Sequence, residues 1–92
     1  MEDIYSNIKS LIQKSRQIYD EALLVYEPIT NVLCAKTASE DEVEYTLDRM
    51  LDFCSDKRML LLFKKICRYY YPIYPEMIAW EINSYRQLWD SE

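Results

Sequence analysis

The sequence predicts an all-α fold, a small antiparallel bundle of four to five helices with a long N-terminal helix. In several segments, apolar residues recur at alternating three- and four-residue intervals, the spacing of one helix face. No stretch alternates with period two over a length that indicates a strand. The 92-residue chain is half apolar, which predicts a single folded domain over residues 1–92.

The first segment, from Asp3 to Tyr26, has the clearest helical pattern, and at about 1.5 Å per residue it predicts a helix of roughly 36 Å. We expect one stripe of this helix to face the rest of the bundle. Its members are Ile4, Ile8, Leu11, Ser15, Ile18, Ala22 and Val25. A second set, Tyr5, Ile12, Tyr19 and Tyr26, recurs every seven residues beside it and widens the apolar face.

Pro28 interrupts this pattern. It is expected either to kink the long helix or to begin a short one, since the first helical position needs no N–H. The short helix would place Ile29, Val32 and Leu33 inward and end near Lys36. Thr37-Ala38-Ser39 is then expected to be a link.

Two helix starts follow from capping signals. Ser39-Glu40-Asp41-Glu42 has the form of a capping box, and its acids suit the positive end of a helix. Ser55-Asp56 supplies a second cap directly after the first helix, and the second helix is expected to end before Pro72. The predicted inward residues are Val43, Leu47, Met50, Leu51 and Cys54, then Met59, Leu60, Phe63, Ile66, Cys67 and Tyr70.

The last helix is expected to begin at Pro75, after a rigid aromatic connector that starts at Tyr71. Its inward stripe is predicted to be Ile78, Ile82, Tyr85 and Trp89, with Met77 and Leu88 at its flanks.

The composition excludes most catalytic machinery. The absence of glycine excludes glycine-rich phosphate loops and nucleophile elbows, and the absence of histidine removes the usual general base and zinc ligand. We therefore predict a protein that is not an enzyme and has no cofactor and no metal site.

Cysteine usage and hydropathy predict a cytoplasmic protein. Cys34, Cys54 and Cys67 form no C-x-x-C pair and are expected to be thiols in a reducing compartment. The longest apolar run, Met59 to Phe63, is far shorter than the ~20 residues of a membrane span, so no membrane association is expected. The acidic N-terminus has no secretory-signal pattern.

Charge is segregated along the chain, which has a net charge of −5. An acidic row recurs every fourth residue at Glu40, Glu44, Asp48, Asp52 and Asp56. Like charges at this spacing destabilise a helix by a few tenths of a kcal/mol each. The row is therefore either a solvated face or a surface for a basic partner, and the second interpretation assigns Glu40, Glu44, Asp48 and Asp52 to binding.

Aromatic residues gather around the connector. Tyr71, Tyr74 and Trp80 are interpreted as an exposed patch of the kind that anchors protein interfaces, with a small second core as the alternative.

These features predict a small acidic protein-binding module, such as an inhibitor, immunity-type factor, antitoxin or adaptor, whose partner is a protein with a basic surface. One alternative is a nucleic-acid-associated regulator that uses a basic helix; its residues are Lys57, Arg58, Lys64, Lys65 and Arg68. The acidic net charge opposes this alternative. A third hypothesis is a homodimerisation module in which the long first helix buries its stripe against a second copy.

Overall fold

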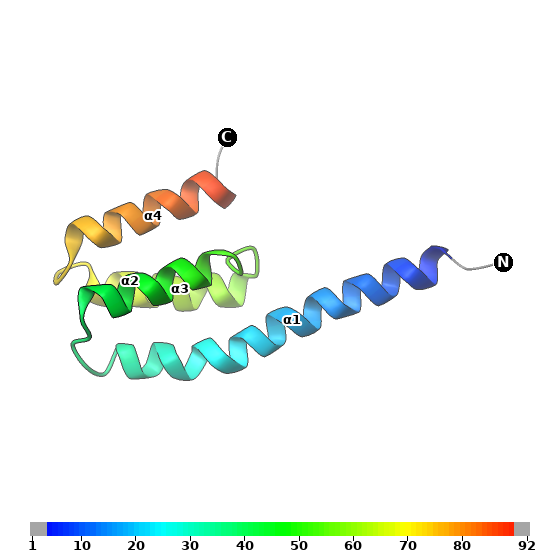
Figure 1. Ribbon diagram of the computed structural model, residues 1–92, viewed down its shortest axis with the longest axis horizontal. Coiled ribbons are helices and arrows are strands. Elements are labelled where there is room, and N and C mark those ends of the chain that lie inside the picture. The colour runs from blue at the N-terminus through cyan, green and yellow to red at the C-terminus, as the bar shows by residue number, and fades with distance from the viewer. Residues whose placement is uncertain (1–3, 90–92) are drawn as a thin grey trace.

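The computed structural model describes the backbone of residues 4–89 and the side chains of residues 17–89. Within the described residues the fold is all-helical, with four helices: α1 (Ile4–Leu33), α2 (Glu40–Leu51), α3 (Lys57–Tyr70) and α4 (Pro75–Trp89). Successive helices run in opposite directions and are joined by short links, and α4 covers the side of α2 and α3 that faces away from α1 (Figure 1).

Both predicted capping signals are confirmed. The Ser39 hydroxyl accepts a hydrogen bond from the Glu42 N–H at 3.2 Å, and the Asp56 carboxylate accepts one from the Arg58 N–H at 2.8 Å. α3 ends before Pro72 and α4 begins at Pro75, as expected. Because the sequence has no glycine, the links are built without left-handed residues, and none of the described residues has a positive φ.

The core lies between α2, α3 and α4. Fully or almost fully buried side chains come from α2 (Val43, Leu47, Met50, Leu51), α3 (Met59, Phe63, Ile66, Cys67, Tyr70) and α4 (Met77, Ile78). These residues confirm the predicted inward faces of α2 and α3 except at Leu60, which is half-buried. On α4 the predicted stripe is only partly buried, because Ile82 and Tyr85 are half-buried and Trp89 is exposed.

Pro28 lies inside α1, so no separate short helix forms after it. The residues predicted to point inward are wrong at Ile18, Val25 and Val32, each of which is 55% exposed. Ala22 is buried as expected, and the predicted residues before position 17 lie outside the described side chains.

The helix turns its tyrosines inward in place of Ile18 and Val25. Tyr19 and Tyr26 pack on the Phe53 ring with centroid distances of 6.1 and 6.3 Å, and the Tyr19 hydroxyl bonds the Ser55 hydroxyl at 2.8 Å. Aromatic rings bury more apolar area than isoleucine or valine and add favourable ring contacts, which accounts for the rotation.

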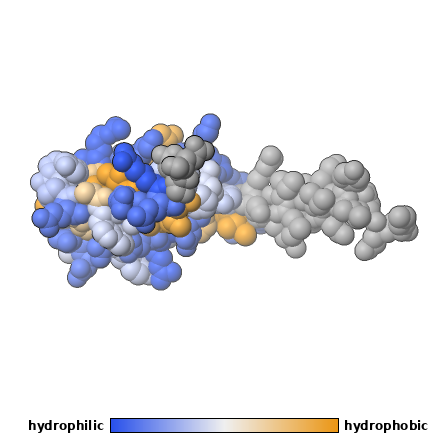
Figure 2. All heavy atoms as spheres, turned by 90° about the horizontal axis from the view of Figure 1, so that it is seen from above, coloured by the Kyte–Doolittle hydropathy of each residue, from blue (hydrophilic) through white to orange (hydrophobic). Residues whose placement is uncertain are grey.

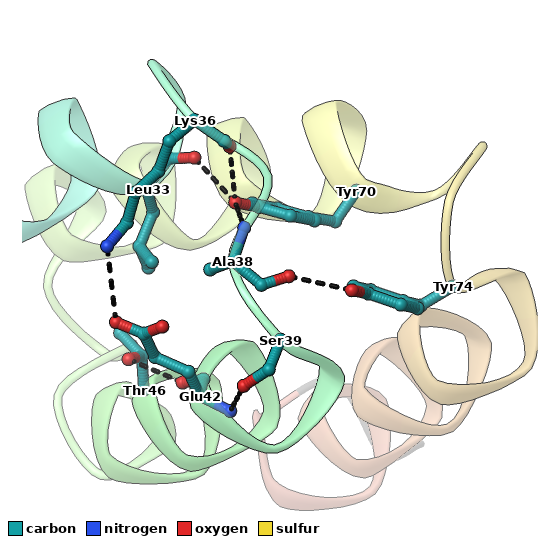
Figure 3. A network of polar contacts seen from close by, with 8 residues as sticks. All are labelled: Leu33, Lys36, Ala38, Ser39, Glu42, Thr46, Tyr70 and Tyr74. Carbon is teal, nitrogen blue, oxygen red and sulfur yellow. Dashed lines mark hydrogen bonds and ion pairs between the residues drawn. The ribbon is translucent and has the colours of Figure 1, made fainter.

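A buried tyrosine holds the link between α1 and α2 (Figure 3). The Tyr70 hydroxyl lies 2.6 Å from the Leu33 carbonyl oxygen and 2.8 Å from that of Lys36, and it accepts the Ala38 N–H at 3.0 Å. Tyr70 therefore ties α3 to backbone groups that the end of α1 leaves unpaired.

Candidate functional site

The strongest candidate site is a hollow of about 470 Å³ between α2 and α4. We call it the acidic hollow, and its lining residues are Glu40, Glu44 and Asp48 of α2 with Glu76, Met77 and Trp80 of α4. Four acidic residues therefore line one hollow together with one tryptophan, and no cation is among the lining residues. Trp80 is 60% exposed, whereas Met77 beside it is buried.

Three of the four acids predicted as a binding face lie together in the acidic hollow, and Asp52 does not. Asp52 lies at the C-terminal end of α2, beside Ile18, Tyr19 and Phe53. An α-helix has 3.6 residues per turn, so each fourth residue lies about 40° further round the axis. After three such steps the row has turned by about 120°, so Asp52 faces α1 instead of α4.

A buried acid that the sequence analysis missed lies on α4 near the hollow. Glu81 has no exposed surface, and neither of its carboxyl oxygens has a hydrogen-bond partner in the described part of the chain. Burial, the neighbouring Asp48 side chain and the charge of Glu44 together raise the pKa of Glu81 to about 9. Glu81 is therefore protonated and neutral at pH 7. Its position three residues after Ile78, on the apolar face of α4, is the signal that could have revealed it.

The three predicted aromatic residues do not form one patch. Trp80 lies in the acidic hollow, and Tyr71 lines a second hollow between α3 and α4. Tyr74 is half-buried, stacks on Tyr70 at a centroid distance of 5.9 Å and donates its hydroxyl proton to the Ala38 carbonyl oxygen at 2.7 Å (Figure 3). Tyr74 is thus part of the small aromatic cluster under the connector, and Trp80 is the aromatic residue that the acidic hollow exposes.

The five cations of the predicted basic row on α3 lie in different environments. Arg58 is held by two acids, with its guanidinium 2.7 Å from Asp56 and 2.8 Å from Asp20. These bonds lower the pKa of the Asp56 carboxyl and raise that of Arg58. Lys64 and Arg68 line the hollow between α3 and α4.

The other two cations of the row, Lys57 and Lys65, are exposed outside that hollow. Lys65 lies near the Cys34 thiol, whose pKa is raised by burial and lowered in part by this charge. The structure therefore does not bring the five cations into one surface.

All three cysteines are free thiols; Cys54 and Cys67 are buried and Cys34 is half-buried. Burial raises the pKa of Cys54 and of Cys67 to about 12, so both thiols are unreactive at neutral pH.

Among residues 17–89, no three acidic or cysteine side chains are arranged to hold a metal ion. None of the described helices combines the length and apolar character that crossing a membrane requires.

Comparison of the chain with protein-family models, with curated proteins and with solved structures finds no match.

Proposed function

We propose that this protein is a binding module whose acidic hollow holds a cationic segment of a partner protein. The observation that carries the proposal is that four acidic residues from two helices line one hollow together with the exposed Trp80. Acidic side chains that only face solvent are common on protein surfaces and change stability little. A purely solvated face gives no reason for acids from two helices to share one concave surface with a tryptophan.

The electrostatics support a cationic ligand. The chain has a net charge of −5, and the hollow concentrates negative charge where no cation lies among its lining residues. Such a concave patch steers a basic partner toward it and raises the association rate.

Trp80 supplies the apolar anchor. An arginine guanidinium stacks on a tryptophan face and can pair with a neighbouring carboxylate at the same time. Tryptophan is also among the residues that contribute most to binding energy at protein interfaces. Glu40, Glu44 and Asp48 lie one helical turn apart, about 6 Å along the axis, which matches arginines at the same spacing on a partner helix.

A module of this kind works by occupying the basic surface of its partner, as an inhibitor, an immunity-type factor, an antitoxin or an adaptor. The proposal assigns it no catalytic step, and a cytoplasmic location stays a prediction from the sequence.

The test uses a fluorescent helical peptide with arginines at positions i, i+4 and i+8. The variant Glu44→Gln/Asp48→Asn should bind it at least about tenfold more weakly, with a smaller dependence on salt. The matched control Glu21→Gln/Glu27→Gln removes the same charge from exposed sites on α1 and should change binding little. Equal weakening by both double variants would show that only net charge matters and would refute the proposal.

We propose self-association through α1 as a second candidate function, with α1 as one long helix. Ile18, Val25 and Val32 are each 55% exposed and lie seven residues apart, and Leu24 beside them is 76% exposed. Figure 2 shows hydrophobic surface next to the residues drawn in grey. The sequence continues the seven-residue spacing back to Leu11 and Ile4, which is the repeat of a coiled coil.

Sedimentation equilibrium tests this second function. We expect a dimer that Val25→Glu converts to monomer, whereas Asn31→Glu, the same charge change at another exposed site on α1, leaves it intact. A wild-type protein that stays monomeric at high concentration would refute self-association.

A further inference from the structure

A second hollow lies on the other side of α4, between α3 and α4, and differs in chemistry from the acidic hollow. It has a volume of about 630 Å³, and we call it the basic groove. Phe63 and Cys67 of α3 and Ile82 of α4 form part of an apolar lining, and Lys64, Arg68 and Arg86 supply the charge.

The charge of the groove is opposite to that of the chain. Three cations and no acid line it, in a protein with a net charge of −5. Lys64 and Arg68 lie one turn apart on α3, and Arg86 faces the groove from α4, so cations stand on both walls. None of the three forms an ion pair within the part of the chain that the structure describes, in contrast to Arg58. The groove is therefore complementary to an anion.

The shape of the groove limits the kind of anion. Its volume lies within the range of about 300–1,000 Å³ that is typical of small-molecule sites, and sites between helices of a bundle are common. The lining residues run along α3 from Leu60 to Tyr71 just after its end, a length of roughly 16 Å. Most of the lining is apolar or aromatic, so a purely polar anion would leave this surface without a partner.

We infer that the basic groove binds an amphipathic carboxylate of the fatty-acid type. Its hydrocarbon chain lies along the apolar lining between α3 and α4, and its carboxylate is paired by the guanidinium groups of Arg68 or Arg86 and the ammonium group of Lys64. The binding is non-covalent, because a free carboxylate does not react with the Cys67 thiol in the groove. This site is separate from the acidic hollow and does not depend on the function proposed for it.

Isothermal titration calorimetry with laurate, below its micellar concentration, tests the inference. We expect saturable binding with one site per chain. Arg68→Gln/Arg86→Gln should weaken it at least about tenfold, because charge-assisted hydrogen bonds to the carboxylate are lost. The matched control Arg49→Gln/Lys57→Gln removes the same charge outside the groove and should leave the affinity unchanged. Circular dichroism of each variant verifies that it is folded.

A second variant tests the apolar part of the groove. Ile82→Trp fills it from a half-buried position and should abolish laurate binding while the helices remain. Four results would each overturn the inference: no laurate binding up to about 1 mM, equal weakening by both double variants, binding of dodecyltrimethylammonium as tight as that of laurate, or binding of an acidic amphipathic helical peptide in place of laurate.

Discussion

Replacement of Glu81 by glutamine should remove a pH dependence of stability that this one residue imposes. Glu81 has no exposed surface and no hydrogen-bond partner among the residues described, and burial with the nearby Asp48 and Glu44 raises its pKa from 4.5 to about 9. In the unfolded chain the carboxyl ionises above pH 4.5, whereas in the folded protein it keeps its proton.

The sign of this pH dependence follows from the number of protons bound in the folded and unfolded states. Between pH 4.5 and about 9 the folded protein holds one proton more than the unfolded chain, so the free energy of unfolding falls as pH rises. The slope is about 1.4 kcal/mol per pH unit, which makes the protein about 3 kcal/mol less stable at pH 7 than below pH 4.5. That loss is a large part of the roughly 5–15 kcal/mol that holds a domain folded.

Urea denaturation between about pH 5.5 and pH 8 measures this effect, since the cysteine thiols stay protonated in that range. Wild-type stability should fall steadily with pH, and that of Glu81→Gln should stay nearly level. Glutamine leaves a buried amide without a partner, which itself lowers the free energy of unfolding. The test therefore compares how the free energy of unfolding changes with pH, and not its absolute value. Glu21→Gln, at an exposed site, should keep the wild-type slope. A level wild-type profile, or the same slope in both proteins, would refute the reasoning.

Three further predictions follow from single contacts. Tyr70→Phe leaves the Ala38 N–H and the Leu33 and Lys36 carbonyl groups without their partner and should lower the free energy of unfolding by about 1–3 kcal/mol in urea denaturation, whereas Tyr45→Phe at an exposed site should not. Ser39→Ala removes the cap of α2 and should cost about 1 kcal/mol in the same assay; an unchanged midpoint would exclude a capping role. Iodoacetamide at neutral pH should modify Cys34, which is half-buried, well before Cys54 and Cys67, and mass spectrometry that finds the buried thiols modified first would contradict their placement.

The parts of the fold that the sequence predicts well depend on local chemistry. The starts of α2 and α3 follow from Ser39 and Asp56, whose side chains bond backbone N–H groups a few residues away. The start of α4 at Pro75 follows from the fixed backbone angle of proline. These interactions need no knowledge of the neighbouring helices, and the structure confirms them.

The parts that the sequence does not predict depend on how helices pack. Two adjacent stripes of α1 are apolar, and only the position of Phe53 on the neighbouring link decides that Tyr19 and Tyr26 turn inward while Ile18 and Val25 stay exposed. The candidate site shows the same division. The helical period of 3.6 residues already places Asp52 on a different side of α2 from Glu40. That the α2 acids share a hollow with Glu76 and Trp80, in contrast, depends on how α4 packs against α2.

The most direct test of the central claim is a titration of the ¹⁵N-labelled protein with the arginine peptide, followed by NMR. If the acidic hollow binds a cationic segment, the Trp80 indole N–H and the Met77 amide should shift together and saturate at one peptide per chain. The Trp89 indole N–H, which is bonded to the Leu51 carbonyl oxygen at 2.7 Å, should stay in place. Small shifts spread over all acidic residues, with the Trp80 signal unmoved, would contradict the claim.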